Sequence, residues 1–281
     1  MGYWTRKKVD WTSKPPLGTP LRSDGHWGVE GLAGAWAFNE GAGATAFDSV
    51  GHANATLKTA AFFNSNGLQC VDAAGGHAIT GQGTTPSQLT GPQTVIARAS
   101  RPEVGAAAYE GLYSVRYTTA PVSLRTGEGP SIQCAWISSN GAAVTPYIVG
   151  GFPYDAVCTV GYVFDGVGVK LYSSAKPSGD ANDYKVTATA TRYIDTTAQI
   201  GLGGDARFFS TGVYSSNINL QVVLVHSRAL SASEIASLSA NPWQIYEPEI
   251  KWVWVEDGGT PTFKPFWALQ SNQIIQPGAF L

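Results

Sequence analysis

The fold of this 281-residue chain is decided by residues 31–51, which run GLAGAWAFNEGAGATAFDSVG. In this stretch Leu32, Trp36 and Phe38 alternate with small or polar residues. Alternation with a period of two is typical of a strand that buries one face, because successive side chains point to opposite sides of a sheet. We therefore expect an early, half-buried strand that carries a tryptophan.

Two turns follow this strand. Residues 40–43 are Glu-Gly-Ala-Gly, and glycine adopts positive φ without penalty, which favours a turn. Residues 48–51 are Asp-Ser-Val-Gly and predict a second turn, after which residues 53–57 resume an extended segment. A tryptophan strand, an acidic glycine turn and an Asp-Ser turn in this order resemble the opening of laminin-G-like domains, which belong to the concanavalin A-like lectin/glucanase superfamily.

The composition of the chain excludes some classes of partner. Hydrophobic residues make up 43% and charged residues only 14% of the sequence, and the formal net charge is −2. Because no basic excess exists, we expect neither nucleic acid nor a membrane surface as a partner. A surface with so few charges suits a protein that packs against other proteins, and the 33 glycines favour many short strands and turns.

The three cysteines, Cys70, Cys134 and Cys158, show no CxxC spacing. An odd number without that spacing argues against a disulfide framework and against a cysteine-rich zinc site. Buried reduced thiols are the favoured interpretation. One bridge between Cys134 and Cys158 is the alternative.

Residues 1–30 predict an extended N-terminal arm. They hold three tryptophans (Trp4, Trp11 and Trp27) among several prolines and glycines, which exclude a helix and disfavour a central strand. Exposed tryptophans invite association, so we expect the arm to dock on its own domain or on a neighbouring protein. The first residues lack the apolar run of a signal peptide, and no stretch is long and apolar enough to predict a membrane span.

The middle of the chain predicts an antiparallel sandwich. Segments of apolar or alternating residues, separated by Gly, Pro, Asn and Ser clusters, predict strands at 94–100, 111–117, 131–137, 145–149, 156–164, 169–173, 198–204 and 220–226. Asp165-Gly166 between two of these segments is a strong hairpin pattern. This hairpin also resembles the central hairpin of laminin-G-like domains.

A short helix follows the last long strand. Ser231 and Glu234 form a capping-box pattern, and Ile235 and Leu238 lie on one face of the predicted helix. Asn241 precedes a proline and ends it. The sequence Arg-Ala-Leu-Ser-x-x-Glu-Ile around this start resembles the closing helix of the same superfamily, so that the resembling domain covers residues 31–245.

Two further segments narrow the resemblance. Residues 238–248 (LSANPWQIYEP) and residues 14–20 (KPPLGTP) resemble parts of lectin-like structural proteins of tailed bacteriophages and prophages. This resemblance implies a virion protein, such as a head decoration or a tail accessory subunit.

Residues 246–281 predict a second, aromatic arm. Residues 250–256 alternate as a strand would, with Trp252 and Trp254 on one face, and a linker and an aromatic tail follow. We expect the arms to add to a neighbouring sheet or groove, or else to fold back on their own sandwich. The candidate partner-contact residues are Trp4, Trp11, Trp252, Trp254, Phe263, Phe266 and Trp267.

The sequence predicts no catalytic site. Glucanases of this fold carry paired carboxylates on one strand, and here Glu247 and Glu249 are alone in having that spacing, outside any predicted central strand. The chain has no nucleophile elbow and no phosphate-binding glycine loop, and its four histidines lack ligand spacing. We therefore expect a protein that is not an enzyme and has no metal or other cofactor.

Calcium and glycans are the ligands that the resemblance leaves open. Lectin-like domains often bind calcium through loop oxygens, which Glu40, Asp48, Asn54 and Asp205 could supply, but the last long strand lacks the acidic residues of metal-binding relatives. Exposed aromatic residues would stack on sugars. The candidates are Tyr109, Tyr113, Tyr147 and Tyr154, although most tyrosines in a sandwich pack across strands.

The sequence as a whole predicts an all-β, jelly-roll sandwich of two antiparallel sheets, with one short C-terminal helix and extended terminal arms. The leading function is a non-enzymatic bacteriophage virion structural protein, assembled in the host bacterial cytoplasm, whose arms bind other virion proteins and further copies of itself. The alternative is a receptor-recognition module that binds host surface glycans.

Overall fold

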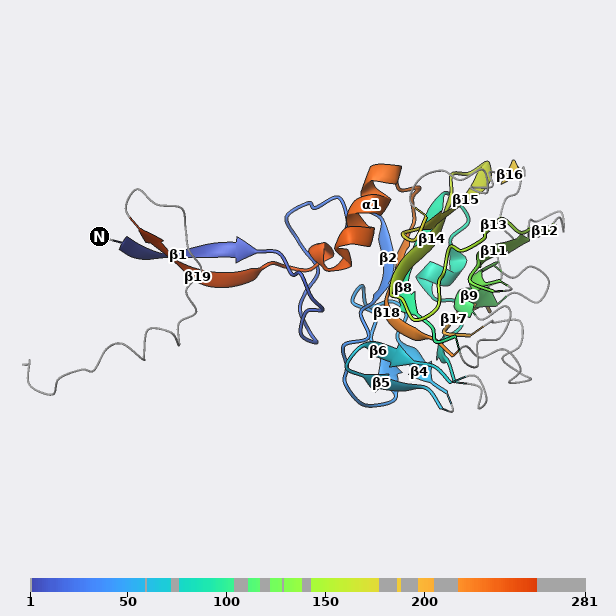
Figure 1. Cartoon of the computed structure of the whole chain (residues 1–281), viewed down its shortest axis with the longest axis horizontal. Helices are drawn as coiled ribbons and strands as arrows, with labels where there is room; N and C mark the ends of the chain where they lie inside the picture. Colours follow the sequence, from blue (N-terminus) through green and yellow to red (C-terminus); the bar gives the residue numbers. More distant parts are fainter. Residues whose placement is uncertain are drawn as a thin grey trace, which may run out of the picture.

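The computed structural model is a sandwich of two antiparallel sheets, which confirms the predicted all-β class (Figure 1). It describes residues 2–58, 60–71, 76–103, 111–116, 122–127, 129–137, 143–176, 186–187, 197–204 and 217–256. Every strand pairing within this part of the chain is antiparallel.

One sheet carries the helix on its outer face, and we call it the helix-side sheet. Its order is β16 (Val186–Thr187), β15 (Gly168–Ser173), β14 (Cys158–Phe164), β8 (Gln93–Ser100), β18 (Asn219–His226), β6 (Gly67–Gln69) and β5 (Phe62–Asn64), with β2 (Leu32–Trp36) also paired to β18. The last long strand therefore lies at the centre of this sheet, as its apolar sequence predicts.

The second sheet, which we call the opposite sheet, faces the first. Its order is β12 (Ala143–Val144), β11 (Ile132–Ile137), β10 (Val122–Thr126), β9 (Gly111–Arg116), β17 (Gln199–Leu202), β7 (Ala78–Thr80), β4 (Ala55–Leu57) and β3 (Thr45–Ala46), with β13 (Tyr147–Ile148) paired to β11. The described residues also form helix α1 (Ala232–Ala240) and the 3₁₀ helices η2 (Thr85–Gln88) and η4 (Pro242–Ile245).

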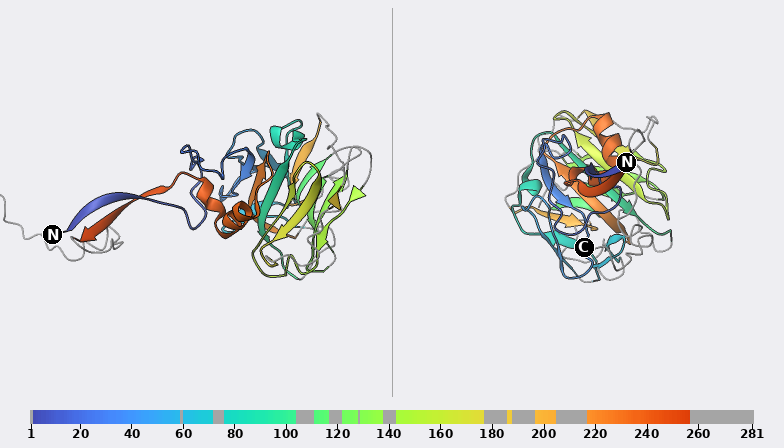
Figure 2. Two further views of the ribbon diagram at one scale, coloured as in Figure 1. Left: turned by 90° about the horizontal axis from the view of Figure 1, so that it is seen from above. Right: turned by 90° about the vertical axis from the view of Figure 1, so that its left-hand side faces the viewer.

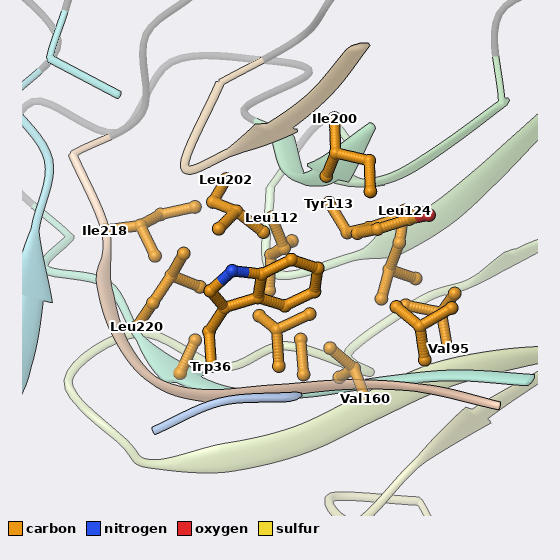
Figure 3. Packing of buried hydrophobic residues seen from close by; sticks show 14 of the residues in the cluster. Trp36, Val95, Leu112, Tyr113, Leu124, Val160, Ile200, Leu202, Ile218 and Leu220 are labelled. Atoms are coloured by element: carbon orange, nitrogen blue, oxygen red, sulfur yellow. The ribbon is translucent and has the colours of Figure 1, made fainter. Parts of the chain in front are cut away.

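The main core lies between the two sheets and is built around Trp36. The indole is fully buried, and its Nε1 donates a hydrogen bond to the carbonyl of Ala53 at 3.0 Å. Figure 3 shows side chains from both sheets around this ring, among them Leu220 of β18 and Leu202 of β17. The predicted tryptophan strand thus supplies the centre of the sandwich.

A second core covers the outer face of the helix-side sheet. Helix α1 and η4 pack there against the outward side chains of β2, β8 and β18. Trp11 and Trp27, from the predicted N-terminal arm, pack against the same cluster. Trp11 is tied in place because its Nε1 donates to the Glu247 carbonyl at 2.9 Å and its own carbonyl accepts from Asn241 Nδ2 at 2.8 Å.

Helix α1 begins where its sequence predicts. Glu234 N–H donates to Ser231 Oγ at 3.3 Å, and Ser231 N–H donates to a carboxylate oxygen of Glu234 at 2.7 Å, so both halves of the capping box are present. The guanidinium of Arg228 lies 2.8 Å from the same carboxylate and lowers the pKa of Glu234 to about 2. Asn241 ends the helix.

The turn that follows β3 is organised by one buried carboxylate. Asp48 Oδ1 accepts hydrogen bonds from the N–H groups of Ala35 (2.7 Å) and Val50 (3.1 Å). Its Oδ2 accepts from His52 (3.0 Å) and Ala53 (3.1 Å). The side chain is only 5% exposed, so these four N–H groups supply the contacts that water would otherwise make.

The two chain ends meet in a separate two-stranded ribbon, which the sequence analysis did not predict. Strand β1 (Gly2–Val9) pairs antiparallel with β19 (Glu249–Glu256), from Gly2 opposite Glu256 to Val9 opposite Glu249. Figures 1 and 2 show that this ribbon projects away from the sandwich. Within the part of the chain that the structure describes, no helix is long and apolar enough to cross a membrane.

Replacement of Asp48 by asparagine is expected to lower the free energy of unfolding by about 3 kcal/mol, because one acceptor oxygen becomes an NH₂ group that faces backbone N–H donors. Urea denaturation of the two proteins measures the difference. Asp165→Asn is the matched control. Asp165 Oδ1 accepts from both Val167 N–H (2.9 Å) and Gly168 N–H (2.8 Å), and an amide oxygen can accept these two bonds as well. An equal effect of the two changes would contradict this role of Asp48.

His226 is fully buried on β18. Its Nε2–H donates to the Gly28 carbonyl at 3.0 Å, and its Nδ1 has no hydrogen-bond partner among the described residues. Burial lowers the pKa of His226 to about 4, while the unfolded chain titrates near 6.5. As the pH falls from 6.5 towards 4, the unfolded state gains a proton that the folded state does not bind.

Folding stability should therefore decrease by about 3 kcal/mol across that interval on account of this one histidine. His226→Asn should show a smaller decrease between pH 6.5 and 4, measured by urea denaturation at each pH. The comparison uses the change in the free energy of unfolding between the two pH values. The absolute free energy is not compared, because the substitution itself changes the core. Parallel pH profiles for the two proteins would disprove the assignment.

Candidate functional site

A polar pocket of about 440 Å³ opens at one end of the helix-side sheet. The end of β6, the end of β8, the start of β18 and the residues before β14 meet here, because Asn219 lies opposite both Gln69 and Ser100 in the sheet. We call it the amide pocket, and it is lined by Asn66, Gln69, Ser100, Arg101, Pro102, Asp155, Val157, Asn217 and Asn219.

The amide side chains at the base of the pocket hold one another in position. Asn219 Nδ2 donates to Asn64 Oδ1 at 3.1 Å and contacts Gln69 Oε1 at 3.4 Å. Gln69 Nε2 donates in turn to the Cys70 carbonyl at 2.9 Å. Asn219 Oδ1 is buried and has no hydrogen-bond partner within the described part of the chain, which leaves one acceptor unsatisfied at the pocket.

The rim of the pocket is fixed by the β5–β6 turn. Asn64 Oδ1 accepts from the N–H groups of Asn66 (2.8 Å) and Gly67 (3.0 Å), which is an Asx-type turn. Lys14 Nζ reaches this turn from the N-terminal segment and donates to the carbonyls of Asn66 (3.2 Å) and Phe38 (2.9 Å). Burial lowers the pKa of Lys14 to about 8. The exposed Asn66 side chain is thereby presented at the pocket edge.

The opposite wall contains a buried guanidinium. Arg101 is 1% exposed, and its guanidinium carbon lies 4.6 Å from the ring centre of Tyr154 and 5.4 Å from that of Phe152. It also donates to the Gly129 carbonyl. The exposed Asp155 adopts a positive φ of 54° and donates its N–H to the Arg101 carbonyl at 2.8 Å. The wall therefore combines one cation and one anion, and the half-buried Tyr154 ring packs on the cation.

A second pocket of about 430 Å³ lies between residues 17–20 and the β2–β3 region. Leu17 and Phe47 form an exposed apolar rim, whereas its polar groups already have partners in the protein. Tyr246 OH lies 3.0 Å from Ser49 Oγ, and burial raises the pKa of this phenol to about 12. The amide pocket therefore has the better set of groups for a polar ligand.

The predicted partner-contact residues fall into three groups. Trp4 and Trp254 pack against each other in the ribbon, with ring centres 5.5 Å apart, and Trp252 is 50% exposed there. Trp11 packs on its own sandwich. Phe263, Phe266 and Trp267 lie outside the described residues.

The carboxylates considered for catalysis have structural partners. Glu247 Oε1 accepts from the Ser23 N–H and hydroxyl, both at 2.8 Å, and Glu249 lies 2.9 Å from Lys251 Nζ.

The oxygens considered for calcium are engaged in a similar way. Asn54 Oδ1 accepts from the Asp48 N–H at 2.9 Å, and Glu40 Oε1 accepts from the Phe47 N–H at 2.7 Å. Asp205 lies outside the described residues, among which no cluster of three metal-ligating side chains occurs. Glu40 and Asn54 therefore accept backbone hydrogen bonds that stabilise turns.

The cysteines and tyrosines are placed differently from each other. Cys70, Cys134 and Cys158 are all free and buried in the main core, and burial raises the pKa of each thiol. Among the tyrosines considered for glycan stacking, Tyr113 belongs to the core and is 1% exposed, so it packs inside the sandwich as most tyrosines of such a fold do. Tyr147 is exposed, Tyr154 lies beside the amide pocket, and Tyr109 is outside the described residues.

Sequence reasoning did not identify the amide pocket. Asn219 and Gln69 are separated by 150 residues, and single amides next to strands give no pattern that differs from an ordinary strand end. The Asn-Ser-Asn-Gly turn at residues 64–67 was the one local feature that could have marked its rim.

No protein-family model and no curated protein sequence matches the chain, but solved structures share its fold. Trypanosoma rangeli sialidase in complex with sialic acid superposes with a TM-score of 0.55 at 15% identity, over 75% of this chain and 33% of that one. Domain 4 of AbnA, an extracellular arabinanase from Geobacillus stearothermophilus, in complex with arabinotriose, superposes with a TM-score of 0.55 at 14% identity. That match covers 74% of this chain and 98% of the domain.

These similarities correct one expectation from the sequence. The chain was expected not to be an enzyme, yet the structures that share its fold include sialidases, which are enzymes. The expectation rested on the absence of paired glucanase carboxylates, a nucleophile elbow, a phosphate-binding glycine loop and histidine ligand spacing, and an enzyme that uses none of these patterns would escape it. The chain spans about a third of the length of these sialidases, and at such low identity the likeness shows the fold. The chain therefore shares a β-sandwich fold with these structures.

Proposed function

We propose that the sandwich binds carbohydrate in the amide pocket. The observation that carries this proposal is the set of pre-positioned amides at the strand ends, of which Asn219 has an unsatisfied buried oxygen. An unsatisfied buried acceptor costs about 1–3 kcal/mol, and a ligand donor that reaches it relieves this cost. Sugar hydroxyls both donate and accept hydrogen bonds, as amide groups do.

The remaining wall of the pocket also suits a sugar. Val157 is 47% exposed and lies with Pro102 beside the polar groups, so the site combines apolar contact area with hydrogen-bonding groups. Ligand sites generally have this composition, since apolar contact supplies binding free energy and a few polar groups fix the orientation. Tyr154 adds a half-buried ring next to the pocket.

The charges in the pocket favour a neutral sugar over an acidic one. The Arg101 guanidinium is covered by two rings and the Gly129 carbonyl, whereas the Asp155 carboxylate is exposed. An acidic sugar would meet the exposed anion before the buried cation. Of the two sugars seen with the similar structures, arabinotriose therefore fits this pocket better than sialic acid.

Isothermal titration with arabinotriose, and with sialic acid in parallel, tests the proposal. We expect saturable binding of arabinotriose that weakens at least about tenfold in Asn66→Ala/Asn217→Ala, since each lost hydrogen bond is worth about 1 kcal/mol. Release of smaller sugars is followed in the same samples, because turnover would show that the pocket also acts on its ligand.

The matched control is Asn39→Ala, which removes an amide at the second pocket. Its Nδ2 donates to the Pro15 carbonyl at 2.9 Å. Unchanged affinity in this control, with loss in the double variant, assigns the ligand to the amide pocket. Loss in the control alone, or no binding of either sugar by the folded protein, would refute the proposal.

As a second function, we propose that the protein is a structural or accessory component of a bacteriophage virion, held there through its chain ends. The phage-like segments at residues 14–20 and 238–248 motivate this, and the ribbon is the specific observation that favours it, because it joins the first and last described segments into one projecting element. Host assembly and other virion proteins as partners belong to the same proposal.

Co-sedimentation with phage particles that lack this protein tests the virion proposal. Full-length protein should pellet with particles, and deletion of residues 2–9, which removes one strand of the ribbon, should abolish this while near-ultraviolet circular dichroism shows a folded sandwich. The amide-pocket double variant serves as the control and should pellet normally. Equal pelleting of the deletion variant would exclude attachment through the ribbon.

A further inference from the structure

The ribbon has two open edges. Strands β1 and β19 are each eight residues long and pair only with each other among the described strands. Since each strand of a two-stranded sheet turns half of its backbone N–H and C=O groups outwards, both edges can accept a further strand. The sandwich does not cover them, because the ribbon projects away from it (Figure 2). A two-stranded ribbon alone is only marginally stable in water, so an additional strand would stabilise it.

One face of the ribbon is aromatic. The register places Trp4 opposite Trp254, and Arg6 opposite Trp252, on the same face. The two rings of the first pair meet edge to face, and the Arg6 guanidinium lies 4.8 Å from the Trp252 ring centre. Trp252 remains 50% exposed and the neighbouring Ile250 58% exposed. Large apolar side chains exposed on a projecting element indicate a surface that is covered in an assembly.

The two edges carry opposite charge. Strand β1 contains Arg6, Lys7 and Lys8 without an acidic residue, which gives it a charge of +3. Strand β19 contains Glu249 and Glu256 against one lysine, which gives −1. If the β1 strands of two copies paired with each other, the three cations of one strand would face the three cations of the other, and the charges would repel. A β1 edge beside the β19 edge of another copy brings opposite charges together.

We propose that the ribbon is a self-assembly element, in which β1 of one copy pairs with β19 of the next copy. Because β1 and β19 run antiparallel within each chain, rotation about an axis along the ribbon brings β1 of one copy antiparallel to β19 of its neighbour. Such head-to-tail contacts form a ring when the rotation that relates neighbouring copies is a whole fraction of a full turn. A ring of ribbons is then a small β-barrel, which has no open strand edges. The tryptophan face then lines its interior. This self-assembly does not depend on what the amide pocket binds or on attachment to a virion.

Charge reversal on each edge tests the proposal with the full-length protein. The variant Lys7→Glu/Lys8→Glu makes both edges acidic, and Glu249→Lys/Glu256→Lys makes both edges basic. In sedimentation velocity we expect the unchanged protein to form a closed oligomer of at least three copies and each variant to dissociate to monomers. A mixture of the two variants should reassemble into mixed oligomers in which the variants alternate, with an even number of copies, because each basic edge then meets an acidic one.

Two controls separate the effect of the edge from damage to the fold. Lys58→Glu/Lys170→Glu changes the net charge equally on the sandwich and should leave the oligomer intact. Reassembly of the mixed variants is a gain that unfolding cannot produce. A monomeric unchanged protein, a symmetric dimer that survives both reversals, or variants that fail to reassemble when mixed would each overturn β1-to-β19 assembly.

Discussion

The Asp48 carboxylate is the interaction on which the sandwich depends most. One oxygen holds a backbone N–H of strand β2 and the other holds two N–H groups of the segment that leads to β4. The two segments belong to different sheets, so a single side chain joins the sheets at this point. Trp36 follows Ala35 directly, and its indole Nε1 donates a hydrogen bond to the Ala53 carbonyl. Because Asp48 holds the N–H groups of both Ala35 and Ala53, it also positions the tryptophan ring at the centre of the core.

The helix-side sheet is buried on both faces, and this limits where polar groups without protein partners can lie. Its inner face packs on the opposite sheet, and its outer face on α1, η4 and the N-terminal segment. In the middle of such strands a polar side chain needs a partner, as Arg98 of β8 has in Gln221 of β18 at 3.0 Å, whereas the strand ends can leave amides open to a ligand. Gln69, Ser100 and Asn219 are such end positions, and the amide pocket lies where they meet.

The amide pocket and the ribbon differ in what stabilises them. The pocket groups are held by hydrogen bonds to backbone and to each other on strands of the sandwich, so they are in place before any ligand arrives. Such pre-organisation lowers the entropy cost of binding. The ribbon strands pair only with each other among the described strands, and their side-chain contacts include Trp4 with Trp254 and Arg6 with Trp252. A binding partner would therefore stabilise the ribbon more than a ligand would stabilise the pocket, and such a dependence on a partner suits an element of assembly.

The sequence by itself determined the local structure: the tryptophan strand, the Asp165-Gly166 hairpin, the capped helix and the central last strand all follow from periodicity and turn chemistry within a few residues. It also determined that residues 250–256 form a strand, but not that its partner is Gly2–Val9. The tertiary structure alone decided this pairing. It also decided that Tyr113 is buried and that Gln69 lies next to Asn219. The physical reason is that these contacts join residues far apart in the chain, and their free energy depends on burial and on partners that no short stretch of sequence contains.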